Sequence, residues 1–282
     1  MGRLILNADD FGLTAGVNRA IMELHRAGVL TSATLMARAA ATDEAIELAL
    51  ATPSLGVGCH VVLVDGEPVI RAQNLPTLVD PRTGRFHPTL GAFLKLLLTG
   101  RIRSSEIEAE TAAQITLLQS CGLRITHIDT HKHAHVFPAV LRPVLHAARA
   151  AGIRAVRNPF EPAWSRRATH GVPWLRRVQM RLLRLLEPTF RLIVAEEGFT
   201  TTDGAIGVLA TGTLDSTIIN SLLRNMPEGT WELVTHPGYN DSDLAKVRTR
   251  LRASREIERE ALLEAILGNE IELIDFSRLG KV

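Results

Sequence analysis

The sequence predicts an α/β protein folded as a distorted (β/α) barrel of the TIM type. Short β-like runs alternate with helical patterns along the chain, which is typical of parallel strands joined by crossover helices. Polar clusters suited to chemistry follow the predicted strands, as they do at the mouth of such a barrel. With 282 residues and 46% hydrophobic content, the chain can bury a full core, and we expect a single domain, 1–282.

Strands and helices alternate regularly over the first 157 residues. The expected strands are 4–7, 31–36, 57–63, 125–129 and 154–157. The expected helices are 15–27, 42–51, 105–121 and 139–151, and a glycine or a proline follows each of them. Glycines and prolines crowd the stretch before the third helix, so we expect an irregular insertion at about 64–104.

The alternation weakens over 158–202, where four prolines interrupt it and predict a second irregular insertion. A weak helical signal follows at 216–225. The strand at 231–235 is clearer, and the chain is expected to end with a long helix at 243–267 and a strand at 271–276.

Charge and cysteine content restrict the function classes. A formal net charge of +2 is too small for a general nucleic-acid binder. Cys59 and Cys121 stand far apart without CxxC spacing, which suits a reducing compartment. The N-terminus lacks the apolar core of a signal peptide, and no run approaches the 18 or so apolar residues of a membrane span. We therefore expect a cytoplasmic protein.

Two adjacent carboxylates, Asp9 and Asp10, follow the first predicted strand. Neighbouring carboxylates repel each other, so a cation or a shared proton is expected beside them. Successive strand residues point to opposite faces, and both can serve one site only if the strand has already broken into a turn, which Gly12 favours. The alternative is one buried structural aspartate and one helix N-cap.

Histidines follow three other predicted strands. From His127 to His135, five polar side chains occupy alternate positions, which share one face if the backbone stays extended. Imidazole with carboxylate suits Zn²⁺, Co²⁺, Ni²⁺ or Fe²⁺ better than Mg²⁺, although chance surface histidines are the alternative. For His133 or His135 taken alone, we expect a role in orienting metal ligands or in the fold as much as a direct role in function. His60 in its apolar strand could be a core histidine, and His236 could cap a strand instead of acting in catalysis.

Taken together and in order, these motifs resemble the YdjC-type carbohydrate deacetylases, which include chitooligosaccharide deacetylase. The matching segments are NADDFG at 7–12, TSATLM at 31–36, GxH at 58–60, HIDTHKHAH at 127–135 and HPG at 236–238. The resemblance covers essentially the whole chain. It implies a distorted (β/α) barrel, one divalent metal ion, magnesium or zinc, and removal of acetyl groups from N-acetylated sugars.

Residue by residue, the resemblance implies that Asp10, His60 and His131 bind the metal and that Asp9 is the general base. A histidine must then protonate the leaving amine, for which we nominate His236 first and His133 second. The family also implies a homo-oligomer.

Two features depart from the commoner family pattern. Lys132 stands where a third consecutive histidine is usual, and residues 61–69 read VVLVDGEPV. Both resemble the hopanoid-biosynthesis-associated branch, whose implied substrate is the N-acetylglucosaminyl headgroup of a hopanoid lipid. This makes chitin fragments a less expected substrate.

An arginine-rich segment, 164–191, could meet a lipid surface. Over 174–186, three arginines share one helical face and an apolar stripe lies on another. Such a helix can lie on anionic lipid at the inner face of the membrane, giving peripheral contact. The alternative is an ordinary surface helix packed on the core.

Two other functions fit the same residues. Two histidines and a carboxylate form the facial triad of non-haem iron oxygenases, but the adjacent Asp9 would then lack a task. A binding module without catalysis could hold a sugar or lipid headgroup through the metal.

Overall fold

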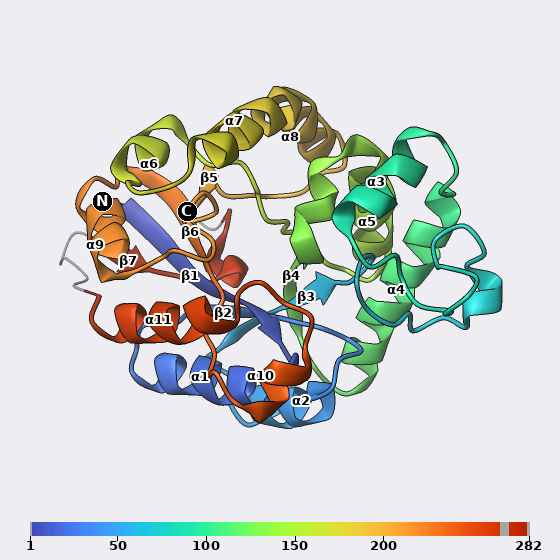
Figure 1. The fold of residues 1–282 in the computed structure, drawn as a ribbon, viewed down its shortest axis with the longest axis horizontal. Coiled ribbons are helices and arrows are strands. Elements are labelled where there is room, and N and C mark those ends of the chain that lie inside the picture. The colour runs from blue at the N-terminus through green and yellow to red at the C-terminus, as the bar shows by residue number, and fades with distance from the viewer. Residues whose placement is uncertain (1, 266–270, 281–282) are drawn as a thin grey trace.

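One curved parallel sheet organises the protein. The structure is a computed structural model that describes residues 2–265 and 271–280. Neighbouring strands follow the order β4-β3-β2-β1-β6-β5, and β7 also pairs with β1. The strands are β1 (Gly2–Phe11), β2 (Ser32–Leu35), β3 (Gly56–Val61), β4 (Ile125–Thr130), β5 (Gly204–Ile206), β6 (Gly229–Thr235) and β7 (Ile271–Leu273). Helices surround this sheet (Figure 1), which confirms the predicted α/β class and distorted barrel.

The helices lie outside the sheet and shield its apolar side chains. They are α1 (Ala15–Arg26), α2 (Thr42–Leu50), α3 (Leu90–Leu98), α4 (Ser104–Ser120), α5 (Pro138–Ala150), α6 (Ala163–Ala168), α7 (Trp174–Leu183), α8 (Glu187–Glu196), α9 (Ser216–Arg224), α10 (Ser242–Lys246) and α11 (Arg252–Leu263). Short 3₁₀ turns are η1 (Ala72–Asn74), η2 (His131–Val136), η3 (Arg184–Leu186) and η4 (Phe276–Arg278). No helix in the described ranges is long and apolar enough to span a bilayer.

The barrel is distorted between β4 and β5. The strand predicted at 154–157 is wrong as a regular strand, because Ala155 and Val156 form only isolated bridges, to Thr200 and Ile128. Prolines directly after this segment cannot extend a ladder of hydrogen bonds. Three-residue β5 was not predicted, because so short a segment carries no periodic signal.

The first predicted insertion is ordered by one face of α4. Glu106, Glu110 and Gln114 are spaced four residues apart, so they share a side of the helix, and all three are buried. They accept hydrogen bonds of 2.8–3.0 Å from backbone N–H groups between residues 62 and 78. The irregular segment therefore satisfies its buried backbone on α4. It also contains α3, which was not predicted as a helix from the sequence.

The second predicted insertion, 158–202, holds three short helices, α6, α7 and α8; Pro173 precedes α7, and Pro188 stands in the first turn of α8. The single long helix predicted at 243–267 is wrong. It is two helices, α10 and α11, separated by five residues from Val247 to Leu251, and its predicted end at Leu267 lies outside the described residues.

A glycine in β3 leaves room for a buried ring. An added Cβ at Gly58 would lie 2.4 Å from Cε1 of His127, whose ring is stacked on Phe276 at a centroid distance of 3.7 Å. Gly58→Ala is therefore expected to lower the free energy of unfolding by about 2–3 kcal/mol, measured by urea denaturation. In the control Gly91→Ala, the new methyl on α3 meets no atom within 4 Å and should not destabilise. Equal stability of the two variants would contradict this packing.

Candidate metal centre

The Asp9–Asp10 pair lies at the carboxyl end of β1, where the strand bulges. Pairing with β2 shifts register between Ala8 and Phe11, and Asp10 has a left-handed φ of 65°. The extra residue in the bulge lets both neighbouring carboxylates contact the same polar cluster. Strand β1 continues to Phe11, but its extended backbone breaks at Asp10, where a turn closed by the hydrogen bond from the Leu13 N–H to the Asp10 carbonyl begins.

Three predicted residues from three strand ends converge. The Asp10 Oδ1 atom lies 3.4 Å from His60 Nε2 and 3.2 Å from His131 Nδ1, and the two nitrogens are 3.3 Å apart. Asp10 and His60 are buried, whereas the side chain of His131 is 20% exposed. These residues could hold a metal ion that solvent reaches from the side of His131.

The donor atoms fit one divalent ion. Ligand atoms about 2.0–2.1 Å from a tetrahedral zinc ion are separated by roughly 3.3–3.4 Å, and octahedral magnesium at a similar distance separates them by about 3.0 Å. The observed separations of 3.2–3.4 Å fall in this range. Asp10 Oδ1 is buried and has no hydrogen-bond partner among the described residues. A cation would satisfy that oxygen.

His60 is oriented by a second carboxylate. Its Nδ1 lies 2.8 Å from Asp129 Oδ1, which leaves Nε2 facing Asp10. This carboxylate–histidine arrangement fixes the ring of many metal-binding histidines. Burial alone would lower the pKa of His60, but the charge of Asp129, its hydrogen bond to the ring and the nearby carboxylate of Asp10 raise it to about 10. The surroundings therefore favour positive charge at this position.

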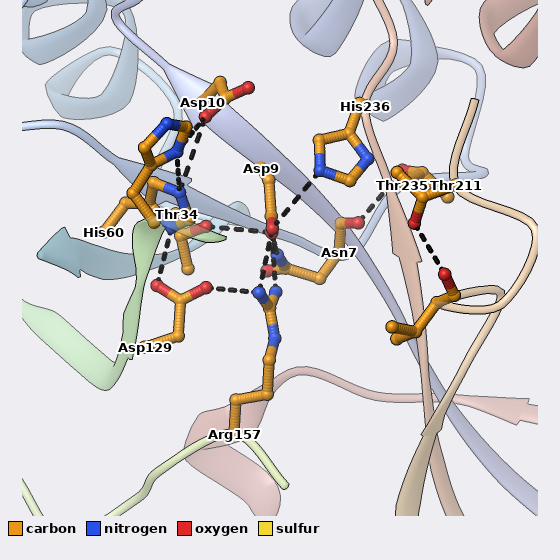
Figure 2. Close-up of polar contacts among 12 residues, drawn as sticks. Asn7, Asp9, Asp10, Thr34, His60, Asp129, Arg157, Thr211, Thr235 and His236 are labelled. Atoms are coloured by element: carbon orange, nitrogen blue, oxygen red, sulfur yellow. Dashed lines mark hydrogen bonds and ion pairs between the residues drawn. The ribbon is translucent and has the colours of Figure 1, made fainter. Parts of the chain in front are cut away.

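Asp9 is clamped by a fully buried arginine. Figure 2 shows Arg157 reaching the carboxylates of Asp9 and Asp129. Arg157 Nη2 donates to Asp9 Oδ1 at 2.6 Å and Nη1 donates to Asp9 Oδ2 at 2.9 Å. Thr34 and Asn7 donate to Oδ1 as well, at 3.2 and 3.0 Å. Oδ2 is therefore the less occupied oxygen of Asp9.

The arginine fixes the charge of Asp9. Burial alone would raise the pKa of this carboxyl, but Arg157 holds it well below its usual range, with His60 and His236 adding to the effect. Asp9, His60 and Asp129 form a second group with donor atoms close enough for a metal. The guanidinium already occupies its carboxylates, so the group of Asp10, His60 and His131 is the better cation site.

His236 faces Asp9 from the end of β6. Its Nε2 lies 3.7 Å from Asp9 Oδ2, and its backbone N–H donates to Glu258 Oε2 at 2.6 Å. Burial lowers the pKa of His236 to about 4 and raises that of Glu258 to about 7. The imidazole is thus held beside the carboxylate with its side chain 11% exposed.

The predicted alternation from His127 to His135 is wrong beyond β4. The strand ends at Thr130, and η2 follows with left-handed φ angles of 58° at Lys132 and 52° at His133. His135 turns inward, with Nδ1 2.7 Å from Thr130 Oγ1 and Nε2 3.2 Å from the carbonyl of Arg157. Its role is therefore structural.

The remaining histidines of this segment lie apart from the three donors. His127 packs on Phe276, as described above. His133 has a buried Nδ1 without a partner among the described residues, and burial lowers its pKa to about 3. His133 is therefore neutral near pH 7 and available as a hydrogen-bonding group.

Buried charged residues around the centre were missed from the sequence. They are Arg157, Glu232, Arg255 and Glu258. Arg255 on α11 pairs with Asp10 Oδ2, and Arg157 Nε donates to Glu232 at 2.7 Å. Arg157, which lies at a predicted strand end, could have been found by the rule used for the histidines. Arg255 and Glu258 carried no signal, because a charged helix normally faces solvent.

The chain is similar to known proteins over nearly its full length. The family model described as YdjC-like protein matches residues 3–272. A carbohydrate deacetylase from Brevibacillus brevis is 34% identical over 288 residues, covering 99% of this chain and 100% of that protein. A human carbohydrate deacetylase is 31% identical and covers 84% of this chain and 75% of its own length.

A solved structure agrees with these relatives. A candidate cellobiose-phosphate cleavage protein from Enterococcus faecalis superimposes with a TM-score of 0.74 and 25% identity, covering 98% of this chain and 97% of that one. The fold is therefore shared along the chain.

Proposed function

The chain belongs to the YdjC-like protein family, and from this we propose that it is a metal-dependent hydrolase that removes the N-acetyl group from an amino sugar. The predicted family is confirmed. The observation that carries the activity is the meeting of Asp10, His60 and His131 beside Asp9, whose pKa is lowered so that the resting carboxyl is ionised. Hydrolysis of an amide needs both an electrophilic centre and a base for water.

Asp10, His60 and His131 would hold the ion, leaving its remaining coordination positions for water and substrate. A divalent ion there supplies a Lewis acid for the acetyl carbonyl and the attacking water. Ligand chemistry favours zinc over magnesium, since two of the three donors are imidazole nitrogens. Arg255 supports this set by engaging the other oxygen of Asp10.

Asp9 would take the proton from water through its less occupied Oδ2. Arg157 keeps this carboxylate ionised and fixed in direction, although the same pairing makes it a weaker base. His236, with its pKa lowered to about 4, is neutral near pH 7, so it would first receive the water proton from Asp9, whose Oδ2 lies 3.7 Å from its Nε2, and then pass that proton to the leaving amine. His133 remains the second candidate for the acid.

The substrate proposal rests on one contact that links both departures from the commoner family pattern. Lys132 Nζ donates to Asp65 Oδ2 at 2.7 Å, and Asp65 belongs to the 61–69 segment. The two departures therefore form a single unit beside the site. They support an N-acetylglucosaminyl hopanoid headgroup as substrate over chitooligosaccharides. The homo-oligomer stays a prediction.

Acetate release tests the function against its alternatives. The protein loaded with zinc or magnesium is incubated with an N-acetylglucosaminyl hopanoid or with chitooligosaccharides, and mass spectrometry follows loss of one acetyl group. Chelator should stop the loss, and added ion should restore it. Binding without acetate release would favour the binding module, whereas oxygen consumption with Fe²⁺ would favour the oxygenase.

Removing one proposed ligand should empty the metal site. His131→Ala is expected to reduce metal affinity at least about a hundredfold and acetate release in parallel, since only two protein donors remain. His131 is partly exposed, so the fold should persist. Metal content is measured by mass spectrometry after dialysis, with His170→Ala, an exposed histidine, as control. Unchanged metal content in His131→Ala would refute the assignment.

A further inference from the structure

The surface of α7 is apolar where a helix normally is polar. In the described chain, ten large apolar side chains are exposed, and six of them belong to α7, η3 and α8. These six are Trp174, Leu175, Val178, Leu182, Leu185 and Leu192. We call them the α7 patch. No residue of α7 is buried, so the ordinary surface helix packed by its apolar stripe is not what this segment forms.

The helix is attached by its opposite side. Arg176 donates to the carbonyls of Val208 and Leu209, each at 2.8 Å, and Met180 packs against a small buried cluster that includes Val208 and Val234. Helical spacing places Trp174, Val178 and Leu182 on another side. The apolar stripe therefore faces outward while an arginine anchors the inner side.

The patch carries positive charge. Seven arginines and one carboxylate, Glu187, lie between residues 163 and 192. Arg167 and Arg181 form no ion pair with a described residue, and Arg181 stands seven residues after Trp174, on the same helical side. Burial lowers the pKa of Arg166, and the charges of Arg184 and Arg181 lower it further. Repulsion among these cations would be relieved by an anionic partner.

The patch lies near the candidate metal centre. Arg176 contacts residues that follow β5, and Met180 packs against the buried cluster that contains Val234, two residues before His236. Figure 1 shows α7 beside β5 and β6, and those strands end on the side of the sheet that carries the cluster. A partner seated on α7 would therefore lie on the side of the protein formed by β5 and β6, from whose end His236 faces Asp9.

We propose that the α7 patch docks on an anionic lipid bilayer, with its apolar side chains at the acyl boundary and Arg167 and Arg181 at the phosphate level. Charge complementarity selects this occupant. A second copy packed face to face would bring the two sets of arginines together. The metal centre would then act at the membrane surface, a placement that rests on the proposed function, whereas docking itself does not.

Vesicle binding tests the proposal with the full chain. The protein is expected to co-sediment with phosphatidylcholine vesicles that contain phosphatidylglycerol. Binding to vesicles of phosphatidylcholine alone should be at least about tenfold weaker. Trp174 should also give a blue shift in fluorescence, because it is 74% exposed in the free protein. The double variants W174S/L185S and R167E/R181E should each lose binding by about tenfold or more.

Controls separate docking from folding and from catalysis. Leu98→Ser changes an equally exposed leucine on α3, 76% against 75% for Leu185, and should bind vesicles normally. All variants should release acetate normally from a soluble substrate. Absence of binding to anionic vesicles would overturn the docking proposal and leave the proposed hydrolase activity unaffected. A dimer that dissociates in W174S/L185S would also overturn it, in favour of a second copy.

Discussion

Replacing Asp9 with asparagine is expected to lower the turnover number for acetate release by about a thousandfold while metal content stays unchanged. The amide keeps the shape of the side chain but cannot accept the proton from water. The three proposed donors of the ion do not include Asp9, so the ion should remain. Acetate release at saturating substrate is compared with metal content on the same sample.

Asp129→Asn is the matched control for that experiment. Asp129 contacts His60 Nδ1 and Arg157 but is not one of the three proposed metal ligands. The substitution should weaken metal affinity by about 10–100-fold. A high metal concentration should then restore the turnover number. Turnover of Asp9→Asn within tenfold of the parent protein would remove Asp9 as the base.

Replacing Arg157 with methionine is expected to lower the free energy of unfolding by about 3–5 kcal/mol near neutral pH. The guanidinium is fully buried and bonds Asp9, Asp129 and Glu232. Without it, three carboxylates remain in the interior without their cation. Chemical denaturation measures the loss. Arg142→Met, which removes the ion pairs of a half-exposed arginine with Glu196 and Glu197, should cost less than about 1 kcal/mol.

The loss should shrink as the pH falls. Burial raises the pKa of Glu232 to about 7 even though Arg157 opposes the shift, so removing Arg157 should raise it further. A carboxyl with a raised folded-state pKa stabilises the fold at low pH and loses that contribution as the pH rises through it. The difference in free energy of unfolding between the variant and the parent should therefore shrink as the pH falls from about 8 to about 5. A difference that is constant with pH would show that lost packing, not charge, causes the destabilisation.

Strand ends were the part of the site accessible from sequence. Parallel strands bring their carboxyl ends together, so the clusters that contain Asp10, His60 and His131 were expected to meet, and the family resemblance implied that these three bind the metal. The structure places their donor atoms within 3.4 Å of one another. The alternation rule failed after Thr130, because it holds only in an extended backbone and Lys132 is left-handed. Local conformation there depends on contacts with residues distant in sequence, such as Asp65.

Burial of charge was the part that sequence could not predict. Arg255 and Glu258 lie in a run of alternating charges typical of a solvated helix, yet both are buried against β1 and β6 residues. The periodicity that predicted one helix over 243–267 continued through the turn between α10 and α11. For the apolar stripe of α7 the sequence left two alternatives open, contact with lipid or packing on the core, and packing on the core is wrong because the stripe faces outward.

The bulge in β1 limits how the centre could evolve or be redesigned. At a left-handed φ of 65°, position 10 accepts aspartate, asparagine or glycine at low cost, whereas longer or branched side chains are strained. His60 lies in a strand and His131 outside the left-handed region. Substitutions that change the metal preference should therefore be tolerated better at positions 131 and 60 than at position 10. Backbone shape, as much as chemistry, therefore restricts the residues that position 10 can carry.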